Sequence, residues 1–295
     1  MKLNELYVDF YKNYMVKRLK ATTIRGYVTN FEKHILPYIG SFNLYDITYS
    51  HIDEIVENGF LYGLNNTSVI YVLRSLSKCL NYGVKRGYLK YNVMCTYDYP
   101  KKSNFRYSVL SMEQLNHLID TSFLFTNCFI AFLLSAHYGL RRGEICGLKV
   151  DDFNYESKLI YINSSVNIVS KCKVIDTPKN GKCRVILLDD YDAWLIYKYN
   201  CENTPNKDGF LLRYNDGKAI SPNIIDKTLK IALKKANLPI VRFHDLRHSY
   251  ATHMIKVGAN PKVVSQVLGH SSVKFTLDTY VHFNLSEQKD LLKLL

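Results

Sequence analysis

Residues 123–150, FLFTNCFIAFLLSAHYGLRRGEICGLKV, contain the strongest structural signal in the chain. Apolar residues dominate the first part of this stretch, which predicts a buried helix over residues 123–138. Arg141 and Glu144 follow in a corner between that helix and a second, apolar-faced stretch. An arginine so close to a core needs a partner or a bound anion, and Glu144, three residues later, can orient it. Taken alone, a structural Arg–Glu pair is the more common explanation.

Strand-like patterns follow this corner. Residues 158–168 alternate between apolar and polar side chains, and residues 172–177 and 183–188 are two further strand-like runs. The last two runs flank an Asn-Gly pair, a dipeptide that is typical of tight β-hairpins. We therefore expect these two runs to form a hairpin within a small antiparallel sheet. Because helical patterns resume at residue 191 and continue to the end of the chain, the predicted class is α+β, mainly α-helical.

The first part of the chain, residues 1–96, is predicted to form a separate helical domain. Apolar residues recur at spacings of three and four over residues 3–14, and a longer amphipathic helix is expected over residues 67–82. Residues 97–108 are polar and lack periodicity, so they are predicted to be a linker. A second domain is expected to occupy residues 109–295.

The chain is strongly basic. It has 295 residues, with 39 Lys and Arg against 26 Asp and Glu, a formal net charge of +13 and a sequence pI of about 9.2. Such a surplus favours polyanionic partners, because neutralising phosphates releases condensed counterions. On charge alone, a nucleic-acid partner and a merely basic surface are equally good explanations.

Cysteine usage and hydropathy narrow the class of protein. The seven cysteines are odd in number and form no C-x-x-C pair, so neither a disulfide framework nor a structural zinc site is expected. The N-terminus lacks the apolar stretch of a signal peptide, and the most apolar stretch, residues 123–136, is too short to cross a membrane. A cytoplasmic protein with reduced thiols is therefore expected.

Two further clusters carry groups suited to phosphate chemistry. His244 and Arg247 lie three residues apart and share one face of a predicted helix. Arginine offers a bidentate fork to a phosphate, and histidine can donate or accept a proton. Downstream, a Gly-His turn at His270 closes a short helix, and Tyr280 lies on or at the end of the next one. Each cluster also fits an ordinary structural or surface role when it is taken alone.

Taken together and in this order, these groups resemble the signature of the phage integrase, or tyrosine recombinase, family. The matching segments are GLRRGEICGL (139–148), HDLRHSYAT (244–252) and LGHSSVKFTLDTY (268–280). Two earlier segments, HILPYIG (34–40) and NYGVKRGYL (81–89), resemble the helical, SAM-like core-binding domain of that family. The resemblance extends over nearly the whole chain and implies a core-binding domain followed by a catalytic domain.

The resemblance also implies an active site of six residues, with Glu144 in support. The six are Arg141, Lys179, His244, Arg247, His270 and Tyr280. Lys182, which lies in the same expected hairpin turn, is the alternative to Lys179, although turn lysines are normally just exposed to solvent. Tyr280 is then the nucleophile that forms a 3′-phosphotyrosine and releases a 5′-hydroxyl. Rejoining needs no ATP, and neither a metal ion nor another cofactor is expected.

The chemistry of phosphodiester cleavage suggests a role for each of the other groups. Arg141 and Arg247 are expected to clamp the non-bridging phosphate oxygens, with a hydrogen bond added by His270. A phenol with a pKa of about 10 needs a base, for which His244 is the candidate. The lysine is the candidate acid for the leaving 5′ oxygen.

The expected partners are double-stranded DNA recombination sites and further copies of the chain, and no membrane is involved. Two duplexes need four active sites, which implies a homotetramer on DNA. The leucine-rich tail, residues 286–295, is expected to dock on a neighbouring copy; the alternative is that it folds on its own domain.

Three other functions share part of the pattern: a relaxing enzyme like type IB topoisomerases, a non-catalytic DNA-binding relative, and a Xer-type chromosome or plasmid resolvase. The long region 163–188 is more like the integrases of conjugative transposons or phages. Since the chain begins directly at the core-binding block, it is expected to lack the arm-binding domain that many such integrases carry in front of it.

Overall fold

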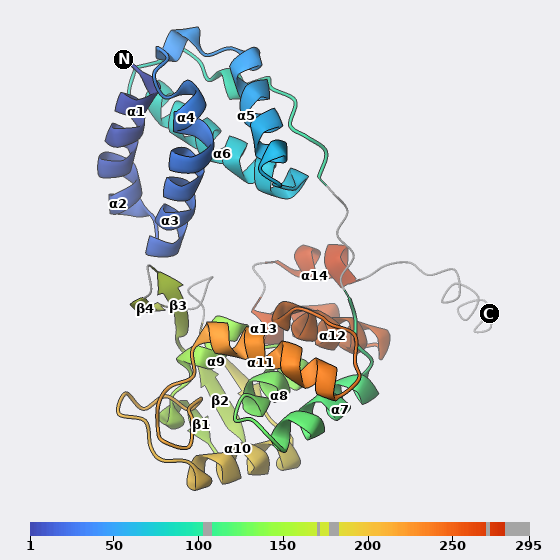
Figure 1. Ribbon diagram of the computed structural model, residues 1–295. Coiled ribbons are helices and arrows are strands. Elements are labelled where there is room, and N and C mark those ends of the chain that lie inside the picture. The colour runs from blue at the N-terminus through green and yellow to red at the C-terminus, as the bar shows by residue number, and fades with distance from the viewer. Residues whose placement is uncertain (103–107, 170–171, 177–182, 270–271, 281–295) are drawn as a thin grey trace, which may run out of the picture. The chain divides into compact units, whose positions relative to one another are not determined.

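The computed structural model describes residues 1–102, 108–169, 172–176, 183–269 and 272–280 of the chain (Figure 1). By their internal contacts, the residues divide into two compact units, Met1–Arg106 and Tyr107–Leu295. Each unit has its own apolar core. Among the helices of the described ranges, none is both long enough and apolar enough to span a bilayer.

The first unit is built from helices. They are α1 (Leu3–Phe10), η1 (Tyr11–Met15), α2 (Val16–Arg18), α3 (Ala21–Asn30), η2 (Phe31–Ile35), α4 (Leu36–Ile39), η3 (Leu44–Asp46), α5 (Tyr49–Leu61), α6 (Asn66–Lys85) and η4 (Val93–Cys95). The longest, α6, is capped by Asn65, whose side chain accepts a hydrogen bond from the backbone N–H of Ser68. It buries Val69, Leu73 and Leu76 at the spacings of three and four that predict an amphipathic helix.

Residues 97–102, part of the stretch predicted to be a linker, belong to the first unit and contact its helices. The Tyr97 hydroxyl donates to Oδ1 of Asp53 at 2.7 Å, and Nδ2 of Asn66 donates to the backbone oxygen of Lys101 at 2.8 Å. The domain boundaries at residues 96 and 109 stay a prediction.

The second unit combines helices with short strands, so the predicted class, mainly helical with a small antiparallel sheet, is confirmed. Its helices are α7 (Met112–Phe123), α8 (Phe129–Tyr138), α9 (Arg142–Gly147), η5 (Val150–Asp152), α10 (Asp190–Glu202), α11 (Pro222–Lys235), α12 (Phe243–Lys256), α13 (Pro261–Leu268) and α14 (Val273–Tyr280). Its strands are β1 (Phe153–Asn154), β2 (Leu159–Ile162), β3 (Ser165–Val169), β4 (Cys172–Asp176) and β5 (Arg184–Leu187).

The buried helix predicted over residues 123–138 is present as α8, but it begins only at Phe129. The residues just before it make other hydrogen bonds. Thr126 Oγ1 accepts from the backbone N–H of Cys128, and Nδ2 of Asn127 donates to the side chain of Asn203 at 2.8 Å. Such side-chain bonds compete with helix formation, which explains the later start.

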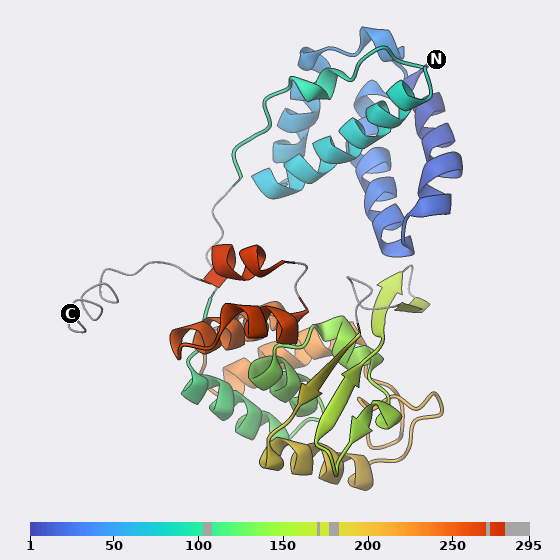
Figure 2. The same ribbon diagram turned by 180° about the vertical axis from the view of Figure 1, so that it is seen from behind.

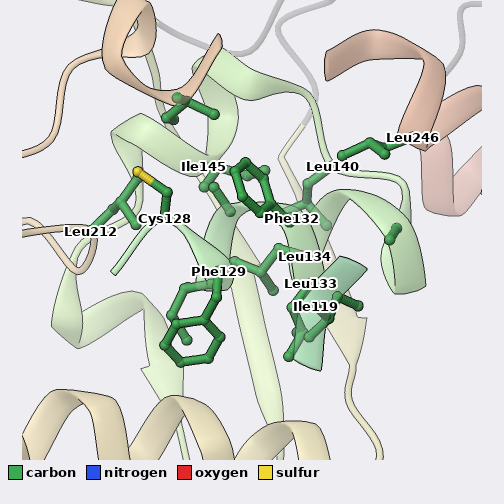
Figure 3. Packing of buried hydrophobic residues seen from close by; sticks show 14 of the residues in the cluster. Ile119, Cys128, Phe129, Phe132, Leu133, Leu134, Leu140, Ile145, Leu212 and Leu246 are labelled. Atoms are coloured by element: carbon green, nitrogen blue, oxygen red, sulfur yellow. The ribbon is translucent and has the colours of Figure 1, made fainter. Parts of the chain in front are cut away.

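Helix α8 is apolar on nearly every side and lies at the centre of the core of the second unit (Figure 3). Leu140 and Leu246 point into the same cluster, and each directly precedes an arginine of interest. Burial of these two leucines therefore fixes the backbone at Arg141 and Arg247.

The main sheet has the order β1-β2-β5, with all pairs antiparallel, and helices cover one of its faces (Figure 2). Strand β4 pairs instead with β3 in a separate ribbon. The predicted hairpin of residues 172–177 with residues 183–188 is therefore wrong within the described strands. Ile160 of β2 and Ile186 of β5 are cross-strand partners on the buried face, and this core pairing outweighs a local turn signal.

Candidate active site

Gly139 ends α8 in a left-handed conformation, with φ of +66°. A Cβ atom at this position would lie 2.5 Å from Cδ2 of Leu268 and 2.8 Å from Cδ1 of Tyr250. Only glycine combines this backbone conformation with such a close approach of α12 and α13. The ends of α8 and α13 are thus brought together directly beside the Arg141 corner.

Arg141 is the N-cap residue of α9, and Glu144 is its third residue. The carboxylate of Glu144 accepts from the backbone N–H of Arg141 at 2.9 Å and from Nη1 of the same residue at 2.8 Å. Glu144 therefore satisfies a backbone donor at the start of the helix and orients the Arg141 guanidinium.

Glu144 is only 1% exposed and contacts a second arginine, Arg184 of β5. Nη1 and Nη2 of Arg184 donate to Oε1 and Oε2 of Glu144 at 3.0 and 2.7 Å. Burial by itself acts to raise the pKa of Glu144. The hydrogen bonds and charge of Arg184, with the charge of Arg141, nevertheless lower the pKa of Glu144 to about 2.

Sequence reasoning missed Arg184, although a signal for it was present. Side chains two residues apart in a strand share a face, and Ile186 of β5 is buried. Arg184 must therefore point inward with it, and a charge that points into a core needs a partner.

Arg247 of α12 is 1% exposed and ties two helix ends together. Its Nη1 donates to the backbone oxygen of Gly139 at 2.6 Å, and its Nη2 donates to the backbone oxygen of Leu268 at 2.7 Å. The guanidinium of Arg247 thus bridges the C-terminal ends of α8 and α13.

His244 lies one turn before Arg247 on α12 and keeps part of its surface exposed. The surrounding protein removes water from its ring, and the positive charges of Arg247 and Arg141 lie nearby, so the pKa of His244 is lowered to about 4. The buried His248 ring stands at 90° to the His244 ring, with ring centroids 4.8 Å apart. Because its pKa is lowered, His244 is neutral at pH 7 and able to accept a proton.

Three successive carbonyls at the end of α13 accept hydrogen bonds from three different arginines. Val267 accepts from Nε of Arg184 at 2.7 Å, Leu268 from Nη2 of Arg247 at 2.7 Å, and Gly269 from Nη2 of Arg141 at 3.0 Å. The last carbonyls of a helix lack partners within the helix and carry the negative end of its dipole. The arginines of three segments therefore converge on the C-terminal end of α13.

The structure brings together Arg141, Glu144, His244 and Arg247. The other residues implied by the resemblance are less fully described. Lys179, Lys182 and His270 lie outside the described residues, although His270 directly follows the loop that the arginines hold. Tyr280 is the last residue of α14, and only its backbone is described.

Within the described residues, one group of histidine and acidic side chains is close enough to hold a metal ion: His137, Asp189 and Asp192, with ligand atoms within 4.8 Å of one another. Nδ1 of His137 lies 2.7 Å from Oδ2 of Asp192, and the Tyr138 hydroxyl donates to both carboxylates at 2.9 Å. Asp189 also accepts from the backbone N–H of Asp192 and so caps α10. We assign this group a structural role, joining the end of α8 to the start of α10.

Two protein-family profiles match the chain. Residues 109–287, more than half of the chain, match the phage integrase family. Residues 2–58 match the phage integrase N-terminal SAM-like domain.

Similar proteins cover almost the whole chain. A tyrosine recombinase of Thermosipho africanus is 26% identical, with 99% of each chain covered. Among solved structures, the Tn1549 transposon integrase in complex with transposon right end DNA has a TM-score of 0.86 at 19% identity, with 99% of each chain covered. A lambda integrase tetramer bound to a Holliday junction has a TM-score of 0.74 at 17% identity, covering 92% of this chain and 78% of that one. At these identities, the two structures establish a shared fold.

Proposed function

Since the chain belongs to the phage integrase family, we propose that it cuts and rejoins DNA at specific sites through a covalent bond between Tyr280 and a 3′ phosphate. The chain is a site-specific tyrosine recombinase. The observation that carries the detailed proposal is the convergence of Arg141 and Arg247 on neighbouring carbonyls, with His244 one turn away from Arg247.

Arg141 and Arg247 supply the positive charge that a DNA phosphodiester requires. The phosphate is negatively charged and repels a nucleophile, and further charge builds on its oxygens in the transition state. Two guanidiniums held in place by backbone and side-chain contacts stabilise that charge. His270, directly after the loop, is proposed to add a hydrogen bond to one oxygen.

His244 is the proposed base for the Tyr280 phenol. With its pKa lowered to about 4, its ring is neutral at pH 7 and can accept a proton. A bound phosphodiester brings negative charge beside the ring, which raises the pKa of His244 toward the range where proton transfer is efficient. Lys179, with Lys182 as the alternative, is the proposed acid for the leaving 5′ oxygen.

The proposed partners are double-stranded DNA sites and three further copies of the chain. The net charge of +13 suits DNA, and a relative of the same fold forms a tetramer on a Holliday junction. We propose the same assembly here, with residues 286–295 docking on a neighbouring copy. A cytoplasmic location is proposed because the described cysteines Cys79, Cys95, Cys128, Cys146, Cys183 and Cys201 are free thiols.

A covalent-trapping experiment tests the chemistry and does not require the DNA site to be identified first. The probe is a pool of duplexes with a randomised centre and a nick, so that the short released fragment diffuses away and traps the adduct. The wild type is expected to give a covalent protein–DNA adduct, and sequencing of the trapped DNA identifies the site. Tyr280→Phe is expected to bind that DNA and give no adduct.

Tyr191→Phe is the matched control, because Tyr191 is an exposed residue of α10. It should form the adduct at the wild-type rate. Adduct formation by Tyr280→Phe would reject the assignment of the nucleophile. Sequence-specific binding without any adduct from the wild type would favour the non-catalytic alternative.

A further inference from the structure

We infer that Arg184 is a positioning residue for DNA cleavage, which it serves by holding Arg141 and the end of α13 in one fixed arrangement. The inference rests on the proposed function, because it concerns the rate of the step that Arg141 assists. Arg184 itself does not need to touch the DNA, since its side chain is only 10% exposed and its guanidinium contacts Glu144 and Val267.

The planar guanidinium of Arg184 contacts two segments at once, α9 through Glu144 and α13 through Val267. Nη1 and Nη2 form a fork on both oxygens of Glu144, and Nε donates in another direction to the Val267 carbonyl. A guanidinium is planar, so the directions of these three hydrogen bonds cannot vary independently. Arg184 therefore sets the distance between the start of α9 and the end of α13.

Glu144 transmits this constraint to Arg141. Its Oε1 accepts from Nη1 of Arg141 at 2.8 Å and from Nη1 of Arg184 at 3.0 Å. Because Arg184 binds both carboxylate oxygens, the carboxylate cannot rotate freely, and the direction it imposes on the Arg141 guanidinium is fixed as well.

Arg184 also contacts Gly269, which directly precedes His270 in the sequence. A Cβ atom on Gly269 would lie 3.0 Å from Nη1 of Arg184, so the loop packs directly on this guanidinium. Arg141 donates to Gly269 and Arg247 to Leu268, yet a bound phosphate would compete for their N–H groups. Arg184, which stays on Glu144 and Val267, then keeps the end of α13 in place.

The test measures the single-turnover rate of adduct formation on the trapped DNA, at saturating protein, beside the affinity for that DNA. Arg184→Met is expected to slow adduct formation on the order of 10²-fold, because a small misplacement of a catalytic group has an effect of this size. DNA affinity is expected to change by less than about threefold. Arg184→Lys keeps the charge but loses the fork, so it should be slower than wild type and faster than Arg184→Met.

A double-mutant cycle separates positioning from a general loss of structure. Because part of the effect of Arg184 passes through Arg141, Arg184→Met should slow an Arg141→Lys protein by clearly less than it slows the wild type. The matched control is Arg213→Lys, because Arg213 is a buried arginine outside the site that donates to backbone carbonyls, including those of Thr204 and Leu211. Arg213→Lys should lower thermal stability while its folded fraction forms the adduct at the wild-type rate.

Additive effects of the two substitutions in the cycle would overturn the inference, as would an Arg184→Met rate equal to that of the wild type. A comparable slowing by Arg213→Lys would assign the effect to folding and would also overturn it. Failure of the wild type itself to form an adduct would instead reject the proposed function.

Discussion

The carboxylate of Glu144 lies between the guanidiniums of Arg141 and Arg184, accepting from Nη1 of the first at 2.8 Å and from Nη1 of the second at 3.0 Å. One buried negative charge thus holds two positive ones, and the corner carries a net positive charge before any phosphate arrives. This surplus suits an anion site, whereas a purely structural pair would need only one arginine.

Glu144→Gln is predicted to lower the free energy of unfolding at pH 7 by about 3 kcal/mol, because it leaves two partly buried guanidiniums without their buried carboxylate. The pKa of Glu144 falls from its ordinary value of 4.5 to about 2 on folding. The stabilisation is therefore complete above about pH 4.5 and is lost as the pH falls toward 2. Urea denaturation of both proteins across this range measures it.

The matched control for this prediction is Asp216→Asn, which removes a carboxylate from an exposed ion pair with Lys218. It should change stability little, since exposed pairs are screened by solvent. A stability difference between wild type and Glu144→Gln that stays constant from pH 7 to pH 2 would contradict the assignment of the stabilisation to the ionised carboxylate.

Gly139→Ala is predicted to destabilise the second unit by about 3 kcal/mol or more, through both backbone strain and the clash of a new Cβ with Leu268 and Tyr250. Gly258→Ala provides the control. Gly258 has a similar positive φ of +84°, but a Cβ there would meet nothing within 4 Å. It should cost only the backbone strain, about 1 kcal/mol. Equal losses, measured by thermal or urea unfolding, would show that close packing at Gly139 is unimportant.

The parts of the fold that the sequence predicted correctly depend on local patterns. The spacing of apolar residues in α6 and the run of apolar residues in α8 identify buried helices whatever their distant partners are. The Arg141–Glu144 contact is similarly local, because three residues separate the two side chains and a helix start brings them together.

The parts that were missed depend on contacts between distant residues. The start of α8 is displaced by Asn127, whose partners Asn203 and Asn215 lie more than seventy positions later. Strand β5 pairs with β2 and not with β4, the strand before it in the sequence, because the pairing with β2 buries Ile186 against the core. Arg184 connects residues 40 positions before it and 83 positions after it, so only its inward direction in the strand was visible in the sequence.

A change of the leaving atom in the DNA distinguishes the two candidate lysines, Lys179 and Lys182. We predict that Lys179→Ala slows adduct formation by about 10²-fold or more, because the 5′ oxygen leaves poorly without a proton. Lys182→Ala, the matched control three residues later in the sequence, should be close to wild type. A duplex with sulfur in place of that oxygen has a leaving group that needs no acid, so it should restore the rate of the Lys179 variant. Rescue of Lys182→Ala instead would reverse the assignment.

Deletion of residues 286–295 is predicted to weaken assembly more than binding to a single site. The segment carries Leu291, Leu292, Leu294 and Leu295, and burying even two leucines on a neighbouring copy contributes enough to change an association constant by at least about tenfold. Gel shifts on a duplex with one site measure the first binding step, and mass photometry of two-duplex complexes measures assembly. Replacing Leu291 and Leu292 by serine keeps the chain length and should reproduce the effect. If the tail folds on its own domain instead, both steps will weaken together, because the loss then acts on each protein molecule before it meets another.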